Sequence, residues 1–193
     1  MSTIIFFDLD DTLFDTSATL RYQLKTLFNQ EYPTNPFAPN YKTSPELYKL
    51  IGEASNMAIS ELYVPLQNIN SWMRDMRGYY DVKFGICSHR GFTPLGEKYS
   101  TMRFRELGLT WDYLHFIKSE EHPNKIDFLN TTYPGENWIL VDDRPLRDNS
   151  IPVPKNCLVM DQIWNQSLDV SPEQRVTPNS VLETLEHIVK INF

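Results

Sequence analysis

The sequence has few cysteines and no long hydrophobic run. Its two cysteines, Cys87 and Cys157, form neither a CxxC pair nor a metal-ligand spacing, so a thiolate metal site is not expected. No stretch approaches the roughly 18 apolar residues that a membrane helix needs. The N-terminus lacks the basic segment of a signal peptide before its short apolar run. We therefore expect a cytoplasmic protein that makes no contact with a membrane.

Positive charge is also scarce. Lys and Arg number 18 against 25 Asp and Glu, which gives a net charge of −7. Extended nucleic-acid binding is therefore not expected. A site for an anion must draw its positive charge from a metal ion, from a few Lys or Arg side chains, or from helix N-termini. Hydrophobic residues make up 41% and charged residues 22% of the 193 residues, which is typical of a globular domain.

Short apolar runs alternate with amphipathic stretches along the chain. The apolar runs predict buried strands at residues 3–7, 82–87, 113–117, 138–141 and 157–160. The amphipathic stretches predict helices at residues 16–28, 94–107, 124–130 and 178–191. Strands that alternate with helices are typical of an α/β fold, and we expect a parallel Rossmann-like sheet with helices on both faces.

One segment interrupts this alternation. Residues 31–80 contain five prolines and no buried-strand run, whereas residues 46–62 have helical periodicity. We therefore expect an α/β core from residues 1–15 and 81–193, with residues 16–80 forming a small, mainly helical cap inserted after the first strand. Ligands of open α/β sheets bind outside the carboxyl ends of the strands, so an insertion there can act as a lid.

Acidic side chains follow two of the predicted strands at their carboxyl ends. Asp8 and Asp10 follow the first strand, Asp142 and Asp143 follow the fourth, and Ser88 follows the second. Carboxylates so close together repel one another unless a cation lies between them. Four of them at two adjacent strand ends make an oxygen-rich site that suits Mg²⁺. Asp residues at strand ends also serve as turn or cap residues, which is the alternative for either pair alone.

The first of these segments resembles a known signature. Residues 8–12 read DLDDT after a hydrophobic strand and resemble the DxDxT motif of the haloacid dehalogenase superfamily. Ser88 resembles the second motif of that superfamily, and the pair Asp142 and Asp143 resembles its fourth. The superfamily carries its first type of helical cap where this chain has its insertion. The resemblance covers most of the chain and implies the fold predicted above.

The third motif of the superfamily is a Lys near the start of the helix before the fourth strand. Lys125 is the better candidate, because it lies at an expected helix start seventeen residues before Asp142. Lys118 is the fallback. The resemblance implies that this lysine neutralises phosphate charge and holds the first acid of the DxDxT motif in place.

The resemblance implies hydrolysis of a phosphomonoester through an aspartyl-phosphate. Asp8 would attack phosphorus, and Ser88 would bind phosphate oxygens. Asp10 would protonate the leaving oxygen and later deprotonate the attacking water, a role for which we expect crowded acidic surroundings to raise its pKa. The dehalogenases of the superfamily lack an acid at this second position, so Asp10 favours phosphate chemistry.

The same resemblance implies a magnesium cofactor and its ligands. Mg²⁺ would be held by the Asp8 carboxylate, the Asp10 backbone carbonyl and the Asp142–Asp143 pair, with Asp143 as the direct ligand of that pair. The ion would shield Asp8 from the anionic phosphate and stabilise charge in the transition state.

A narrower resemblance concerns the substrate. Residues 86–88 and 140–145 read ICS and LVDDRP and are similar to segments of the 5'(3')-deoxyribonucleotidases, although that family usually has Gly where this chain has Asp11. We expect a small phosphorylated substrate, with a nucleoside monophosphate as the first choice. A phosphatase of sugar phosphates or of polynucleotide ends is an alternative. A non-catalytic module that binds a phosphorylated ligand or a partner is the alternative from another functional class.

Three further side chains are candidates for substrate contact. Arg90 and Arg144 lie just beyond motif positions, where they would meet phosphate or ribose or else be solvated loop charges. Phe14, together with Trp72 and Met73, would line a base-stacking pocket under the cap. Aromatic residues at helical spacing more often belong to a hydrophobic core, which is the alternative for these three.

Overall fold

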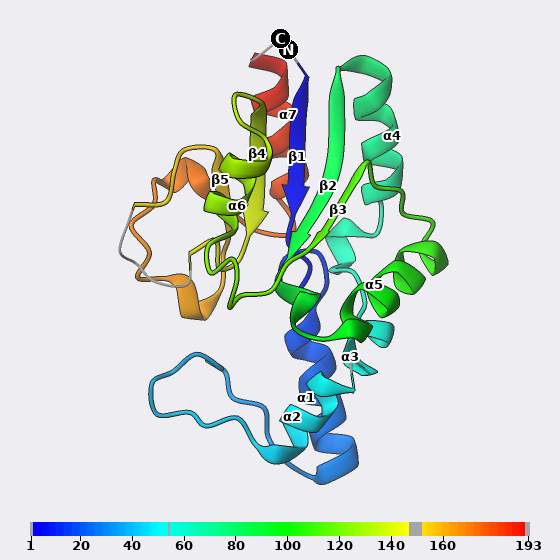
Figure 1. The fold of residues 1–193 in the computed structure, drawn as a ribbon, viewed down its shortest axis with the longest axis vertical. Coiled ribbons are helices and arrows are strands. Elements are labelled where there is room, and N and C mark those ends of the chain that lie inside the picture. The colour runs from blue at the N-terminus through cyan, green and yellow to red at the C-terminus, as the bar shows by residue number, and fades with distance from the viewer. Residues whose placement is uncertain (1, 54, 147–151, 192–193) are drawn as a thin grey trace.

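The protein is built on one parallel β-sheet (Figure 1). The computed structural model describes residues 2–53, 55–146 and 152–191. Its sheet has six strands in the order β3-β2-β1-β4-β5-β6, and every neighbouring pair is parallel. The strands are β1 (Thr3–Phe7), β2 (Val82–Ser88), β3 (Tyr113–Phe116), β4 (Asn137–Asp142), β5 (Cys157–Met160) and β6 (Arg175–Val176). The predicted α/β class with a parallel sheet is confirmed.

The central strand β1 is buried on both faces, which is why it reads as an unbroken apolar run. Successive side chains of a strand point to opposite faces of the sheet. Ile5 and Phe7 therefore belong to one hydrophobic cluster, and Ile4 and Phe6 belong to another. A core on each face needs helices on each face to cover it.

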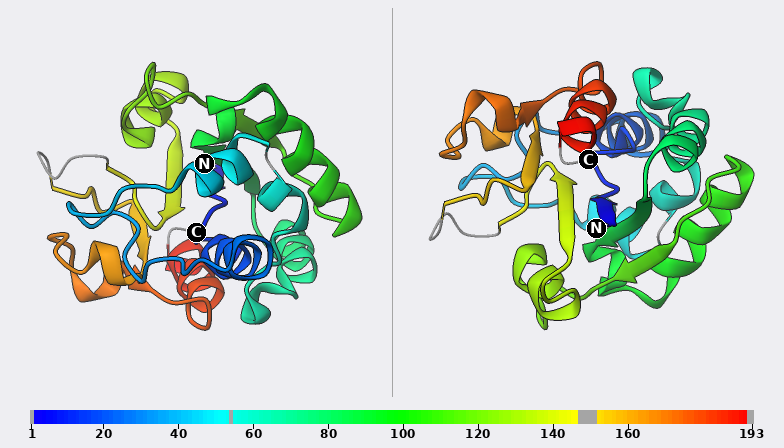
Figure 2. Two further views of the ribbon diagram at one scale, coloured as in Figure 1. Left: turned by 90° about the horizontal axis from the view of Figure 1, so that it is seen from below. Right: turned by 90° about the horizontal axis from the view of Figure 1, so that it is seen from above.

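Helices cover both faces of the sheet (Figure 2). On one face α4 (Ile69–Tyr79) and α7 (Val181–Ile191) bury Met73, Val181 and Leu185 against the sheet. On the other face α6 (Lys125–Thr132) buries Leu129. The helix α5 (Pro94–Glu106) begins with Pro94 in its first turn and adds Phe104 to the first cluster.

Three helices of the segment 16–80 lie beyond the carboxyl ends of the strands, below the sheet in Figure 1. They are α1 (Thr16–Phe28), α2 (Pro45–Gly52) and α3 (Ser55–Ile59). The helix predicted over residues 46–62 is therefore two shorter helices, and the first ends at Gly52, a poor helix former. Leu20 and Leu24 pack against Leu47 and Leu50, which joins α1 to α2.

The helix α4 belongs to the sequence segment 16–80 but packs against β2 and α7 rather than with α1. The part of this segment that overhangs the strand ends is therefore the part before α4. The boundaries of a core and a cap at residues 16 and 80 stay a prediction. None of the helices in the described ranges combines the length and the apolar character that crossing a membrane requires.

Candidate active site

Three buried carboxylates meet where β1 and β4 end. The two strands are hydrogen-bonded neighbours with Phe7 opposite Val141, so Asp8 and Asp142 follow at the same level. One carboxylate oxygen each from Asp8, Asp142 and Asp143 lies within 4.8 Å of the others. The side chains predicted to converge at the ends of the first and fourth strands thus lie together.

Lys125 is the cation in contact with this cluster. It is the first residue of α6 and is only 3% exposed. Its Nζ lies 2.8 Å from Asp8 Oδ1 and 2.7 Å from Asp142 Oδ2. Lys118 lies outside the site, where it is exposed and pairs with Glu121. The structure therefore brings the preferred lysine candidate into the site and leaves the fallback in solvent.

The cluster has three carboxylates and one contacting lysine, and the pKa values of two of these carboxylates are raised. Burial raises the pKa of Asp8 to about 6, against the lowering effect of Lys125 and with help from the charges of Asp142 and Asp10. Burial and the charges of Asp142 and Asp8 hold the pKa of Asp143 well above its usual range. A divalent cation among these oxygens would offset that cost, and hard oxygen donors are what Mg²⁺ prefers. The residues present therefore fit a magnesium ion.

Asp10 has a partner that the sequence did not reveal. Arg90 Nε donates to Asp10 Oδ2 at 3.0 Å, and Arg90 Nη2 donates to Asp10 Oδ1 at 2.7 Å. Burial alone would raise the pKa of Asp10, but the Arg90 guanidinium holds it below its usual value. This is opposite to the predicted rise. The Asp10 backbone carbonyl as a metal ligand stays a prediction.

Arg90 is buried and paired with Asp10, so it is not the solvated loop charge that was its alternative, and its contact with a substrate stays a prediction. It is 1% exposed, and its Nη1 donates to Ser100 Oγ at 2.9 Å. Its guanidinium carbon lies 5.6 Å from the centre of the Phe14 ring. Phe14 is itself fully buried and stacks on Phe104 at 6.4 Å between centroids. Arg90 therefore holds the Asp10 carboxylate, and the Phe14 ring packs against the Arg90 guanidinium.

Phe14 is fully buried in a hydrophobic cluster and does not line a base-stacking pocket under the cap. Trp72 packs edge-on against Phe84 of β2, with 5.5 Å between the ring centroids. Met73 is fully buried in the same cluster. The alternative of a core role holds for Phe14, Trp72 and Met73, because α4 lies on the face of the sheet.

A cavity of about 170 Å³ opens onto the cluster. Ser88 reaches it from the end of β2 and is 1% exposed. Arg144 reaches it from the loop after β4, where its backbone N–H donates to Asp142 Oδ1 at 2.7 Å. Of the predicted site residues, Asp8, Asp10, Ser88, Lys125 and Asp143 line this cavity, whereas Asp142 lies buried behind it. The other lining residues are Asp11, Phe37, His89 and Arg144.

Asp143 is held by residues that sequence reasoning missed. The indole N–H of Trp164 donates to Asp143 Oδ2 at 2.7 Å, and Asn165 Nδ2 donates to the Asp143 backbone carbonyl at 2.8 Å. The hydroxyl of Thr12 accepts from the Asp143 backbone N–H at 3.0 Å. Trp164 and Asn165 lie in the short 3₁₀ helix η3 (Ile163–Asn165), in a stretch without hydrophobic periodicity. No sequence signal marks them as partners of an acid 21 residues away.

Comparison with known proteins supports the fold. No family model matches the sequence, and no curated protein matches it. The structure resembles the putative HAD-hydrolase YfnB of Bacillus subtilis bound to magnesium, with a TM-score of 0.55 at 16% identity over 98% of this chain and 99% of that one. It also resembles the L-2-haloacid dehalogenase of Xanthobacter autotrophicus with chloropropionic acid covalently bound, with a TM-score of 0.53 at 9% identity over 96% and 99% of the two chains.

A third similar structure is CbbY of Rhodobacter sphaeroides in complex with phosphate. Its TM-score is 0.52 at 14% identity, over 96% of this chain and 100% of that one. Identities this low show a common fold and leave the reaction open. The chain thus shares its fold with solved structures that include a putative HAD-hydrolase and a haloacid dehalogenase, which confirms the fold that the resemblance of residues 8–12 implies. The narrower resemblance to nucleotidases stays a prediction.

Proposed function

We propose that this protein is a hydrolase of small phosphomonoesters that depends on Mg²⁺ and uses Asp8 as its nucleophile. The observation that carries the proposal is the buried group of Asp8, Asp142 and Asp143 with Lys125 as the cation that contacts it. Such an excess of negative charge is costly in a buried site unless it binds a cation. Magnesium-assisted phosphoryl transfer uses an arrangement of this kind.

The three carboxylates of this group would supply oxygens to Mg²⁺, and the bound ion would neutralise the charge of the incoming phosphate. Lys125 holds Asp8 Oδ1 at 2.8 Å and thereby orients the other oxygen. That oxygen would attack phosphorus, and the bond between phosphorus and the leaving oxygen would break. Ser88 would donate its hydroxyl to a phosphate oxygen. Water would then attack the aspartyl-phosphate and release inorganic phosphate.

Asp10 would carry the protons of both steps. In the Arg90 pair its carboxylate is ionised at neutral pH, which suits it to accept a proton from the attacking water. Donation to the leaving oxygen requires a protonated carboxyl. A phosphoryl dianion bound beside Asp10 brings negative charge close to it, and like charge raises the pKa of a carboxyl. Substrate binding would therefore favour the protonation that the first step needs.

The fold itself also serves carbon–halogen hydrolysis, as the Xanthobacter autotrophicus structure shows for that protein. An acid at position 10 and the cation-poor acidic cluster favour phosphate chemistry in this chain. The test therefore includes a 2-haloacid beside a panel of phosphomonoesters, with release of halide and of phosphate measured in the presence of Mg²⁺.

The decisive variant is Asp8→Asn. It removes the nucleophile with little change in shape, so we expect phosphate release to fall by about a thousandfold or more while thermal unfolding stays cooperative. The control is Asp75→Asn, an exposed acid on α4 that should leave activity unchanged. Lys125→Met should also lose activity, whereas Lys118→Met should not. Full activity of Asp8→Asn, or of the wild type in excess EDTA, would overturn the proposal.

A further inference from the structure

Asp143 is the carboxylate of the acidic cluster that depends most on contacts outside the sheet. Asp8 still donates its backbone N–H to the Val141 carbonyl of β4 at 2.9 Å, and Asp142 is the last residue of β4. Asp143 lies one residue beyond that strand, in the loop that follows. A metal ligand on a loop needs other partners to stay at bonding distance from the ion. The contacts that hold Asp143 therefore set the shape of the metal site.

Two side chains from the loop after β5 hold Asp143. They belong to the β5 loop, defined as residues 161–168. Trp164 holds the carboxylate through its indole N–H at 2.7 Å, and Asn165 holds the backbone carbonyl through its Nδ2 at 2.8 Å. The position of the Asp143 backbone and the orientation of its carboxylate therefore both depend on where the β5 loop lies.

The β5 loop also contacts the segment that carries the other acids. Gln162 Nε2 donates to the backbone carbonyl of Asp11 at 2.9 Å, in the turn directly after Asp8 and Asp10. The loop thus contacts the acidic segment after β1 as well as the one after β4. A displacement of the β5 loop would change the distance between Asp8 and Asp143, which are two of the three carboxylates of the cluster.

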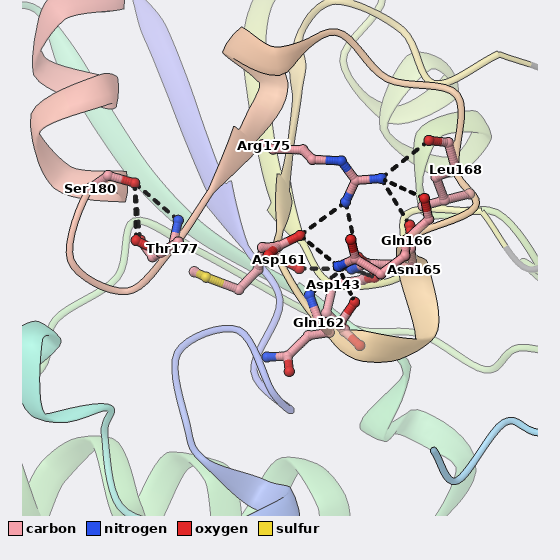
Figure 3. Close-up of polar contacts among 10 residues, drawn as sticks. Asp143, Asp161, Gln162, Asn165, Gln166, Leu168, Arg175, Thr177 and Ser180 are labelled. Atoms are coloured by element: carbon pink, nitrogen blue, oxygen red, sulfur yellow. Dashed lines mark hydrogen bonds and ion pairs between the residues drawn. The ribbon is translucent and has the colours of Figure 1, made fainter. Parts of the chain in front are cut away.

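The β5 loop is itself held by Arg175 (Figure 3). Arg175 lies on the edge strand β6, in parallel register with Val159 of β5, so its backbone belongs to the sheet. Its side chain is 24% exposed and points into the loop. A planar guanidinium presents its N–H donors in a fixed arrangement, so it holds several acceptors in one geometry. The acceptors here are Asp161 Oδ1, Asn165 Oδ1 and the backbone carbonyls of Asn165, Gln166 and Leu168.

Asn165 connects Arg175 to Asp143. It is 2% exposed, and its Oδ1 accepts from Arg175 Nη1 at 3.2 Å and from the Gln162 backbone N–H at 3.1 Å. Its Nδ2 donates to the backbone carbonyls of Asp143 and Met160 at 2.8 Å and 2.7 Å. A buried amide whose N–H groups and oxygen lone pairs are all engaged has one favourable orientation. Loss of the Arg175 contact would therefore loosen the amide that holds Asp143.

We propose that Arg175 is a positioning residue of the metal site, which acts through Asn165 and the β5 loop to fix Asp143 relative to Asp8. The inference rests on the Mg²⁺ dependence in the proposed function and names a residue, remote from the ion, on which that dependence relies. Mg²⁺ requires a near-ideal octahedron of oxygens at about 2.0–2.1 Å, whereas Ca²⁺ accepts irregular sets of oxygens at about 2.3–2.6 Å. A loosened Asp143 therefore weakens the binding of Mg²⁺ more than that of Ca²⁺.

The test compares the affinities of the full chain for Mg²⁺ alone and for Ca²⁺ alone. Both are measured by calorimetry without substrate, at a temperature at which circular dichroism shows each variant folded. Arg175→Met should lower the Mg²⁺ affinity about tenfold and the Ca²⁺ affinity about twofold or less, so the ratio of the two should fall about fivefold. A merely structural role would lower the folded fraction and with it both apparent affinities by one factor, which leaves the ratio unchanged.

The matched control is Arg77→Met, the same substitution at an arginine whose side chain is 30% exposed. Arg77 donates to the Thr110 carbonyl and to Asp112 Oδ2, just before β3 begins and hence at the opposite end of the strands. Its affinity ratio should equal that of the wild type. Should Arg175→Met not fold, Arg175→Lys takes its place. It keeps the charge but loses the planar fork, and should lower the ratio about twofold or more.

The outcomes separate this inference from the proposed function. A wild-type ratio in the folded Arg175 variant would overturn the positioning role and leave the proposed function standing. If the ratio falls as expected but no phosphomonoester is hydrolysed, the positioning role holds and the proposed reaction fails. A wild-type protein that binds no Mg²⁺ would overturn both.

Discussion

The pair of Asp10 and Arg90 should respond very differently to removal of its two members. Asp10 has a side chain that is 39% exposed, whereas the Arg90 side chain is 1% exposed. Asp10→Ala would leave the guanidinium buried without its carboxylate, although it would still donate to Ser100 Oγ at 2.9 Å. Arg90→Met would leave a carboxylate that reaches solvent and still accepts from Thr16 Oγ1 at 2.7 Å.

The burial of each group sets the expected magnitudes. Loss of one member of a buried ion pair costs about 3–5 kcal/mol, and Asp10→Ala should lie near the lower value because water can enter from the exposed side. Arg90→Met keeps the apolar stem over Phe14, so its cost should be about 1 kcal/mol. For a chain of this length each kcal/mol lowers Tm by about 2–4 °C. We therefore expect Tm to fall by about 6–12 °C in Asp10→Ala and by about 2–4 °C in Arg90→Met.

The assay is thermal unfolding of both single variants and of the double variant in the presence of EDTA. The double variant should have a Tm close to that of Arg90→Met, because it no longer buries an unpaired cation. Equal losses in the two single variants would refute the reasoning. The Tm values also matter for the activity of Asp10→Ala. A loss of activity in this variant reflects loss of stability as well as loss of proton transfer if its Tm falls as expected.

Two further predictions concern the metal. Trp164→Phe keeps an aromatic ring but removes the N–H that donates to Asp143 Oδ2, so the affinity for Mg²⁺, measured by calorimetry, should fall about tenfold. The control is Trp72→Phe, which removes an indole N–H on α4 that has no hydrogen-bond partner. Unchanged Mg²⁺ affinity in Trp164→Phe would contradict the role of Trp164 in positioning Asp143. The pKa values of Asp8 and Asp143 are raised in the folded state, so the folded protein keeps protons that the unfolded chain releases near pH 4. In EDTA the free energy of unfolding should therefore fall as the pH rises from about 4 through about 6 and above. The fall should be at most about 1.4 kcal/mol per pH unit for each proton. Urea unfolding at pH 5, 6 and 7 should show this fall, Asp8→Asn should reduce it, and Mg²⁺ should reverse it; an equal slope in Asp8→Asn would exclude Asp8 as a source.

The sequence predicted the fold and the centre of the site because both depend on local patterns. Apolar runs such as residues 3–7 are long enough to mark strands, and Gly108 marks the end of α5. The acids that follow β1 and β4 lie side by side because parallel strands end at one edge of the sheet. Nothing more than strand order is needed to bring Asp8 and Asp142 together.

The partners of those acids were not predictable in the same way. Arg90 contacts Asp10 across 80 positions, and Trp164 contacts Asp143 across 21. Neither pair follows from a periodicity, because each depends on how a loop leaves its strand. The burial of Phe14 likewise depends on a residue distant in the sequence, because Phe104 of α5 stacks on its ring. Sequence patterns thus predict where the charged side chains lie, whereas tertiary packing determines which of them are paired within the protein and which are accessible to a substrate.

Asp11, where the nucleotidases usually have glycine, affects the attachment of helix α1 rather than the chemistry of the site. Asp11 has a φ of 53°, a left-handed conformation that costs a non-glycine residue about 1–2 kcal/mol. Its carboxyl accepts from Ser17 N at 2.8 Å and from Ser17 Oγ at 2.7 Å. Each bond contributes about 1 kcal/mol, so together they offset the strain. A glycine would adopt this φ without strain but could not make these bonds, so the Asp11 carboxyl holds the first turn of α1 to the loop.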